Sequence, residues 1–284
     1  MKEAMYYNKI EDKKVHCYLC PHNCRIAPGK VGICRVRENR DGILYSLNYG
    51  KVSSAAMDPI EKKPLYHFYP GSDILSVGSF GCNLTCSFCQ NWSIAHKVPH
   101  TDSVTAEQLI KTAQEHKNCI GIAYTYNEPS IWYEYVYETA VKAKEAGLKN
   151  VLVTNGYISQ QPLKDILPYI DAMNIDVKGF TNEYYTTICG GTLEEVKKTV
   201  EIAALLCHIE VTTLVVPDLN DSIREIRELS QWIAGINPRI PLHLTRYFPN
   251  YKMTDRHPTP VETLYKAREE AEKYLTYVHL GNVW

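Results

Sequence analysis

Short apolar runs alternate with amphipathic, helix-like runs along most of the chain after residue 72. Apolar and β-branched residues predict strands at 73–82, 120–126, 150–155, 172–178, 208–216, 241–247 and 277–280. Helical spacing predicts helices at 105–117, 131–146, 161–170, 193–206, 222–234 and 261–275. Repeated βα units of this size predict a parallel sheet with right-handed crossovers. Six units and a terminal strand indicate an α/β fold with a partial (β/α)6 barrel.

The first 72 residues do not follow the βα alternation. They are rich in cysteine, and Pro70-Gly71 is a natural turn between the two parts of the chain. We therefore expect two domains: a cysteine-bearing N-terminal element at residues 1–72 and the barrel at residues 73–284.

Composition narrows the possible classes of protein. Hydrophobic residues make up 45% of the 284 residues and charged ones 22%, which excludes a disordered chain. The net charge of −1 argues against nucleic acid or a membrane surface as partner. Since the sequence has no apolar run of roughly 20 residues and no signal-type segment, it predicts a cytoplasmic protein.

Cysteine is used in an unusual way. Seven of the ten cysteines lie in the first ninety residues, at spacings that close to two or three residues. A disulfide framework is typical of short secreted chains, whereas this spacing suits thiolates that converge on a metal centre. The seven are Cys17, Cys20, Cys24, Cys34, Cys82, Cys86 and Cys89.

The most specific motif is Cys82-x3-Cys86-x2-Cys89, at the end of the first predicted barrel strand. Three thiolates can ligate three corners of a 4Fe–4S cluster and leave the fourth iron open to a small molecule. The carboxyl ends of barrel strands are also where α/β barrels build active sites. The alternative is a structural zinc knuckle.

The string Gly81–Trp92 around this motif resembles the signature of radical S-adenosylmethionine (SAM) enzymes, in particular pyruvate formate-lyase activating enzymes. The segment Asp58–Ser72 and the N-terminal cysteines are similar to those of AmmeMemoRadiSam-system radical enzymes, and the resemblance covers nearly the whole chain. It implies a 4Fe–4S cluster on Cys82, Cys86 and Cys89, with SAM on the open iron. Reductive cleavage of SAM would give a 5′-deoxyadenosyl radical, with an electron donor such as flavodoxin or ferredoxin.

The resemblance also implies cofactor contacts near the first two strand ends. Phe88 corresponds to an aromatic residue that shields the cluster or lies near adenine, although it also reads as an ordinary apolar loop residue. Tyr126-Asn-Glu-Pro resembles the family's Gly-Gly-Glu-Pro segment, which binds the methionine ammonium. Glu128 supplies the carboxylate there, and Asn127 departs from the family pattern.

Further cofactor contacts are expected on later strands. Asp176 and Lys178 match an Asp-x-Lys of the activating enzymes and project on one face of their strand, where an interior ion pair is the alternative. Asn155 ends the third strand, where it is a candidate contact or a turn former before Gly156. His243 resembles a cofactor-contacting position, and a core histidine is the alternative.

Cys17-x2-Cys20-x3-Cys24-x9-Cys34 supplies four thiolates, enough to close a second metal site. Ligand type alone leaves zinc and a second iron–sulfur cluster open.

Taken together, these features predict a radical SAM oxidoreductase whose substrate is unidentified. Resemblance to activating enzymes makes a glycyl-radical enzyme a candidate protein partner. A radical SAM enzyme acting on a small molecule or an RNA base is one alternative, and near-neutral charge disfavours RNA. A non-catalytic metal-binding scaffold is the alternative from another class.

Overall fold

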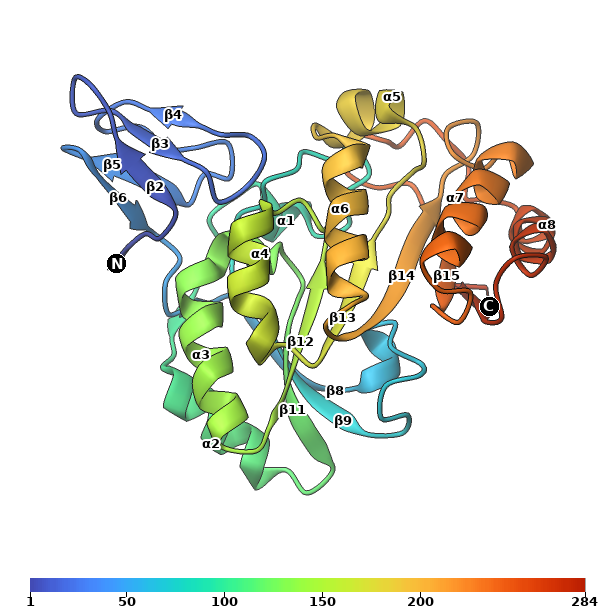
Figure 1. Ribbon diagram of the computed structural model, residues 1–284, viewed down its shortest axis with the longest axis horizontal. Helices are drawn as coiled ribbons and strands as arrows, with labels where there is room; N and C mark the ends of the chain where they lie inside the picture. The colour runs from blue at the N-terminus through green and yellow to red at the C-terminus, as the bar shows by residue number, and fades with distance from the viewer. Residues whose placement is uncertain (284) are drawn as a thin grey trace.

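An eight-stranded sheet dominates the computed structural model, which describes residues 1–283 (Figure 1). The strand order is β16-β15-β14-β13-β12-β11-β9-β8. All neighbours pair in parallel except the edge strand β8, which is antiparallel to β9. The strands are β8 Ser54–Pro59, β9 Asp73–Gly78, β11 Cys119–Tyr124, β12 Lys149–Thr154, β13 Ala172–Asp176, β14 His208–Val215, β15 Leu242–Arg246 and β16 Val278–Gly281.

Helices connect successive parallel strands and cover the outside of this sheet (Figure 1). The longer helices are α2 Ala106–Glu115, α3 Tyr133–Glu145, α4 Gln160–Ile166, α6 Leu193–Ala203, α7 Ile223–Ile236 and α8 Val261–Ala271. The shorter ones are α1 Trp92–Ala95, α5 Asn182–Tyr184, η1 Ile60–Lys62, η2 Pro129–Trp132, η3 Leu167–Tyr169 and η4 Tyr185–Cys189. The predicted partial barrel of six βα units and a terminal strand is confirmed.

Local chemistry explains several element ends. At α2, Thr105 and Gln108 form a reciprocal capping box, which satisfies backbone N–H groups that have no partner inside the helix. The predicted helix 131–146 divides into η2 and α3, with Pro129 at the first position of η2. The predicted strand 73–82 ends at Gly78, and Gly81 has a φ of +88°, which a strand does not allow.

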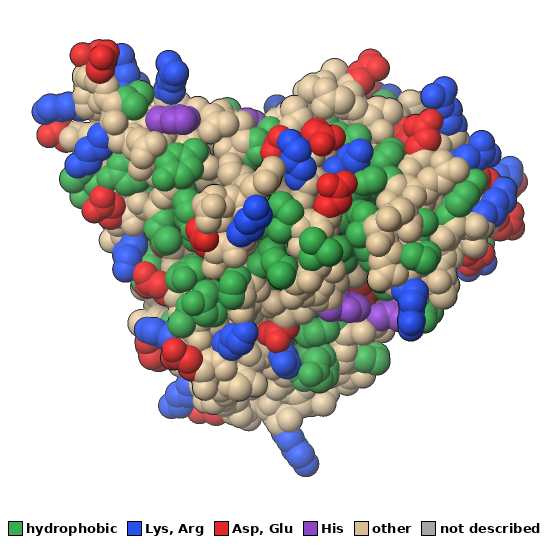
Figure 2. Space-filling model, in the orientation of Figure 1, with side chains coloured by type: hydrophobic (Ala, Val, Ile, Leu, Met, Phe, Trp, Pro, Cys, Tyr) green, Lys and Arg blue, Asp and Glu red, His purple; other side chains and the backbone are tan. Residues whose placement is uncertain are grey.

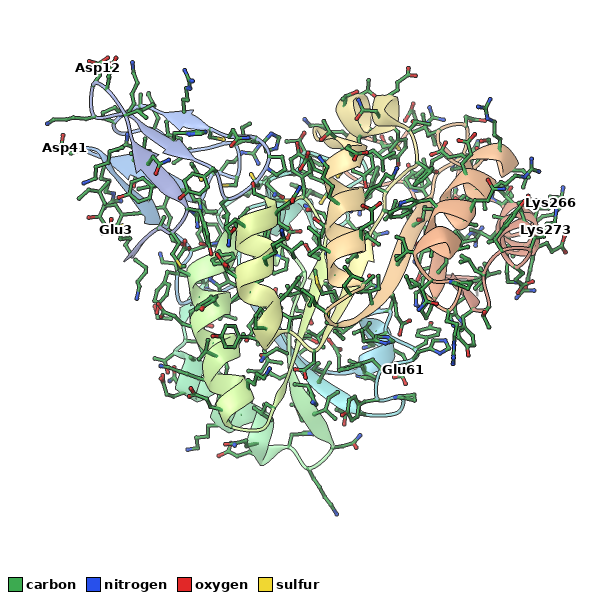
Figure 3. All side chains as sticks on the ribbon, in the orientation of Figure 1. Glu3, Asp12, Asp41, Glu61, Lys266 and Lys273 are labelled. Carbon is green, nitrogen blue, oxygen red and sulfur yellow. The ribbon has the colours of Figure 1, made fainter. Side chains whose placement is uncertain are left out.

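The N-terminal part consists of small antiparallel sheets to one side of the barrel (Figure 1). Two three-stranded sheets have the orders β1-β6-β5 and β2-β3-β4, and β7 pairs with β10. Their strands are β1 Lys2–Glu3, β2 Tyr7–Lys9, β3 Val15–Cys17, β4 Arg25–Ile26, β5 Arg37–Arg40, β6 Ile43–Ser46, β7 Lys51–Val52 and β10 Asp102–Ser103. In Figure 3, Asp12 and Asp41 mark the tip of this part, and Lys266 of α8 and Lys273 just after α8 lie at the opposite side of the molecule.

The chain from 54 to 72 belongs to the barrel in space. Residues 54–59 form β8 within the large sheet although they precede the expected domain boundary at residue 72, and that boundary stays a prediction. After β8, Ile60, Leu65 and Phe68 pack against residues at the starts of β9, β12 and β13 and in β11. The amide of Asn174 also donates to the Pro64 carbonyl at 2.8 Å. We call residues 60–68 the plug, because they cover the amino ends of the strands.

Within residues 1–283, no helix is long and apolar enough to cross a lipid bilayer.

Candidate functional site

The loop after β9 carries Cys82, Cys86 and Cys89, and backbone hydrogen bonds from distant segments hold it. The Thr85 N–H donates to the Cys189 carbonyl at 2.8 Å, and the Ser87 N–H donates to the Ile188 carbonyl at 3.1 Å. The Lys252 N–H donates in turn to the Ser87 carbonyl at 3.0 Å. The cysteine loop is therefore fastened to η4 and to the loop after β15.

The three thiols of this loop are close enough to influence one another electrostatically. Burial raises the pKa of Cys82 and Cys89, and a hydrogen bond with Cys189 together with burial raises that of Cys86. The Asn155 amide lies 3.6 Å from the Cys82 sulfur and donates toward it. Deprotonating these buried thiols thus requires a cation, which a bound metal group supplies.

Glu128 joins the carboxyl ends of β11 and β12. Its carboxylate accepts from the Ser130 N–H at 2.9 Å, the Thr154 hydroxyl at 2.7 Å and the Asn155 N–H at 2.8 Å. Burial raises the pKa of this carboxyl, and these hydrogen bonds oppose that rise. The carboxylate is thus held rigidly beside Cys82, whose pKa it helps to raise.

The Asn127 side chain forms hydrogen bonds with the backbone at the start of the cysteine loop. Its Oδ1 accepts from the Ser79 N–H at 2.8 Å, and its Nδ2 donates to the Gly81 carbonyl at 3.1 Å. A glycine at this position has no side chain to form this clamp. The departure from the family pattern therefore has a structural use in fixing the loop against β11.

Asp176 and Lys178 form an ion pair with 2.9 Å between Oδ2 and Nζ, which is the alternative that the sequence left open, and their contact with a cofactor stays a prediction. Burial disfavours the charged ammonium, but Asp176 and Cys86 outweigh it and raise the pKa of Lys178. The Lys178 ammonium lies 6.0 Å from the centre of the Phe88 ring. This cation opposes the rise in the pKa of the Cys86 and Cys89 thiols that burial causes.

Two buried hydroxyls near the cysteine loop have no hydrogen-bond partner among the described residues. They belong to Ser87 in the loop and to Tyr184, whose ring centre lies 6.3 Å from that of Phe88. Unpaired buried hydroxyls are costly, so these two fit a polar group bound beside the loop.

The cysteine loop supplies the ligand type and number that an open 4Fe–4S cluster takes, one thiolate on each of three irons. Within residues 1–283, no three His, Cys, Asp or Glu side chains lie close enough together to hold one metal ion. Cys82, Cys86 and Cys89 would hold such a cluster, with Lys178 and Glu128 beside it.

His243 is not brought to this loop. It is the second residue of β15, and its Nε2 lies 2.6 Å from the Glu210 carboxylate in the buried interior. Its ring packs edge-on against Tyr66 of the plug and lies near His279 of β16. His243 thus makes a core contact at the plug, because it stands near the start of its strand, and the cofactor contact expected of it stays a prediction. In Figure 2, histidine side chains reach the surface below β14 and β15.

Sequence reasoning missed Cys189 and Asn83. Cys189 is fully buried and hydrogen-bonded to Cys86, but it stands alone in the sequence. Asn83 is fully buried, donates to the Tyr157 carbonyl at 2.6 Å and accepts from Asn155 at 2.9 Å. Its position between Cys82 and Cys86 is the sequence signal that could have identified it as a site residue.

A family model of the radical SAM superfamily matches residues 76–230, which include the cysteine loop and the strand ends described above. The chain belongs to this superfamily. It is a radical SAM enzyme related to the activating enzymes, and the family binds a 4Fe–4S cluster and SAM.

Individual relatives agree with this membership. An uncharacterized protein of Methanocaldococcus jannaschii is 47% identical over 290 residues, covering 100% of this chain and 86% of its own. The pyruvate formate-lyase-activating enzyme of Clostridium pasteurianum is 27% identical over 229 residues, covering 72% of this chain and 91% of that enzyme.

Solved structures share the fold at low identity. Streptococcus suis SuiB bound to SAM has a TM-score of 0.56 at 14% identity, covering 70% of this chain and 47% of SuiB. SuiB bound to its precursor peptide SuiA has a TM-score of 0.55, covering 70% of this chain and 46% of that one. The shared fold is the partial barrel.

Proposed function

We propose that this radical SAM enzyme abstracts hydrogen from a protein or peptide segment, in the manner of an activating enzyme. The observation that carries the proposal is the cysteine loop at the carboxyl end of β9, with a buried carboxylate and a buried ammonium beside it. A bound 4Fe–4S cluster and SAM supply the hydrogen-abstracting radical chemistry. The cytoplasm is the proposed location.

The chain's own side chains would bind the cluster and SAM and hold them in position. Cys82, Cys86 and Cys89 are the proposed ligands of three irons. Asn155 donates toward the Cys82 sulfur, which favours the thiolate form over the thiol. Lys178 places a cation near Cys86 and Phe88, where it can also pair with the carboxylate of SAM.

Glu128, Asn127 and Asp176 are proposed to position this site. The Glu128 carboxylate fixes the turn at Asn155, and the Asn127 amide fixes the loop at Gly81. Asp176 is partly exposed and holds the Lys178 ammonium, while it remains able to accept from a ribose hydroxyl.

A macromolecular substrate needs an opening in the barrel, and the sheet has two edges, β8 and β16. The plug covers the amino ends of the strands, which leaves the carboxyl ends as the side of approach. The named activities of the relatives, activation of pyruvate formate-lyase and binding of a precursor peptide, agree with a polypeptide substrate. The net charge of −1 disfavours RNA.

The test uses the full chain, reconstituted anaerobically with iron and sulfide and reduced in the presence of SAM. Uniformly deuterated protein, small-molecule and RNA fractions from cells of the source organism are supplied separately. We expect deuterium in 5′-deoxyadenosine only with the protein fraction. Deuterium from either other fraction alone contradicts a polypeptide substrate.

The matched control pair separates the site from the rest of the chain. Cys86→Ser is expected to abolish release of 5′-deoxyadenosine, since the cluster loses a ligand. Cys207→Ser, at a half-buried thiol that bonds only the Ala203 carbonyl, is expected to keep it. Equal activity in both variants would overturn the assignment of the cysteine loop.

A further inference from the structure

Four cysteines of the N-terminal part line one pocket, although they are spread over three segments. Cys17 ends β3, Cys20 and Cys24 lie in the connection to β4, and Cys34 precedes β5. All four thiols are free. Apolar side chains, among them Ile131 next to α3, complete the wall.

A buried cation lies beside these thiols. The Arg37 side chain is 1% exposed, lines the pocket and donates to the Cys17 sulfur at 3.8 Å. It is paired with the equally buried Glu134, and its Nε has no partner among the described residues. Arg37 therefore places a buried positive charge in the wall of the cysteine pocket, where it would face thiolates bound to a metal group.

Four thiols in one pocket are a complete ligand set for a closed 4Fe–4S cluster, which takes one thiolate on each of its four irons. A single zinc ion, with four sulfurs at about 2.3 Å from one point, is the alternative that metal analysis separates from it.

We propose that Cys17, Cys20, Cys24 and Cys34 hold a second 4Fe–4S cluster, closed by four thiolates. With no open iron, this cluster does not bind SAM. Its assignment does not depend on which substrate the enzyme uses.

The proposed cluster site is packed directly against the cysteine loop of the barrel. A Cβ on Gly81 would lie 2.9 Å from the Cys34 carbonyl oxygen, so the two segments touch just before Cys82. The His22 Nε2 lies 2.6 Å from the Asn83 carbonyl oxygen, and the Ser159 N–H donates to the Leu19 carbonyl at 3.0 Å. Ordering of the N-terminal site therefore supports the loop that carries the SAM-binding cluster.

The test measures iron, sulfide and zinc in the anaerobically reconstituted full chain. We expect about eight irons per wild-type chain, from two clusters of four. A Cys82→Ser/Cys86→Ser/Cys89→Ser variant removes the SAM-binding cluster and is expected to keep about four irons with a cluster spectrum. Zinc at about one per chain in this variant, or no metal, overturns the proposal.

A second variant removes the N-terminal thiols and keeps the cysteine loop. Cys17→Ser/Cys20→Ser/Cys24→Ser/Cys34→Ser is expected to keep about four irons and to bind SAM, detected as a change in the electron paramagnetic resonance of the reduced cluster. If this variant fails to fold, the three-cysteine variant still decides the case. Eight irons in the four-serine variant would overturn the proposal. Wild-type protein that holds about eight irons but abstracts no hydrogen from the protein fraction would contradict the proposed function and leave the second cluster standing.

Discussion

Glu210 of β14 shows how a single carboxylate organises the amino end of the barrel. Its fully buried side chain accepts from the Tyr66 N–H at 3.1 Å and the His67 N–H at 2.8 Å, both in the plug. Two imidazoles, His208 and His243, lie 3.0 and 2.6 Å from its oxygens. Burial alone would raise the pKa of Glu210, but these partners lower it to about 2.

The Glu210→Gln variant is expected to lose about 3 kcal/mol of unfolding free energy at pH 7, because the buried network loses its negative charge and one of its two acceptor oxygens. The folded pKa of about 2 lies below the ordinary 4.5, so the carboxylate stabilises fully above pH 4.5 and loses this effect as pH falls toward 2. Urea unfolding of both proteins at pH 7 and pH 3.5 should show a smaller gap at pH 3.5. An equal gap at the two pH values would contradict this role.

At the scale of elements, the contact between the N-terminal part and the cysteine loop depends on Gly81. Its φ is +88°, and a Cβ there would lie 2.6 Å from Cγ1 of Val36. Gly71 has a similar φ of +80° but open space around it. A substitution at Gly71 therefore measures the backbone strain alone, without the clash.

Gly81→Ala is expected to cost about 1–3 kcal/mol more unfolding free energy than Gly71→Ala, because only the former forces overpacking. It should also lower the iron content of the reconstituted protein, since the clash displaces the backbone next to Cys82. Chemical denaturation and iron analysis of the two variants provide the measurement. Matching values for both would mean that the close contact at Gly81 has no energetic weight.

At the scale of the whole molecule, the plug covers the amino end of the open barrel, and the cysteine loop lies at the carboxyl end. Leu65 is fully buried among residues from several strands, in a cluster with Ile60, Phe68 and Ile74. Its contribution is to global stability, because the cysteine loop lies at the carboxyl ends of the strands.

Leu65→Ala is expected to lower the free energy of unfolding by about 3 kcal/mol through the cavity that it leaves. Iron content and SAM cleavage at low temperature should stay at wild-type levels. The control is Leu205→Ala, at a side chain that is 83% exposed, which should change stability very little. Loss of iron in Leu65→Ala without loss of stability would contradict this division between the two ends.

The alternation of parallel strands and longer helices from β9 onward, and with it the partial barrel, was predictable from the sequence. Strand and helix periods are local, so runs such as 150–155 and 172–178 indicate their elements without knowledge of the rest of the chain. The Cys82-x3-Cys86-x2-Cys89 spacing is local too, and so is the Asp-x-Lys spacing that predicted a shared face for Asp176 and Lys178.

Only the tertiary structure decided which distant residues meet. β8 joins the sheet although it precedes the predicted boundary, and His243 pairs with Glu210 at the plug instead of reaching the cysteine loop. Arg37 meets Glu134 across 97 positions of sequence. Such contacts depend on how segments far apart in the sequence pack against one another in space, and the local pattern of polar and apolar residues does not specify that packing.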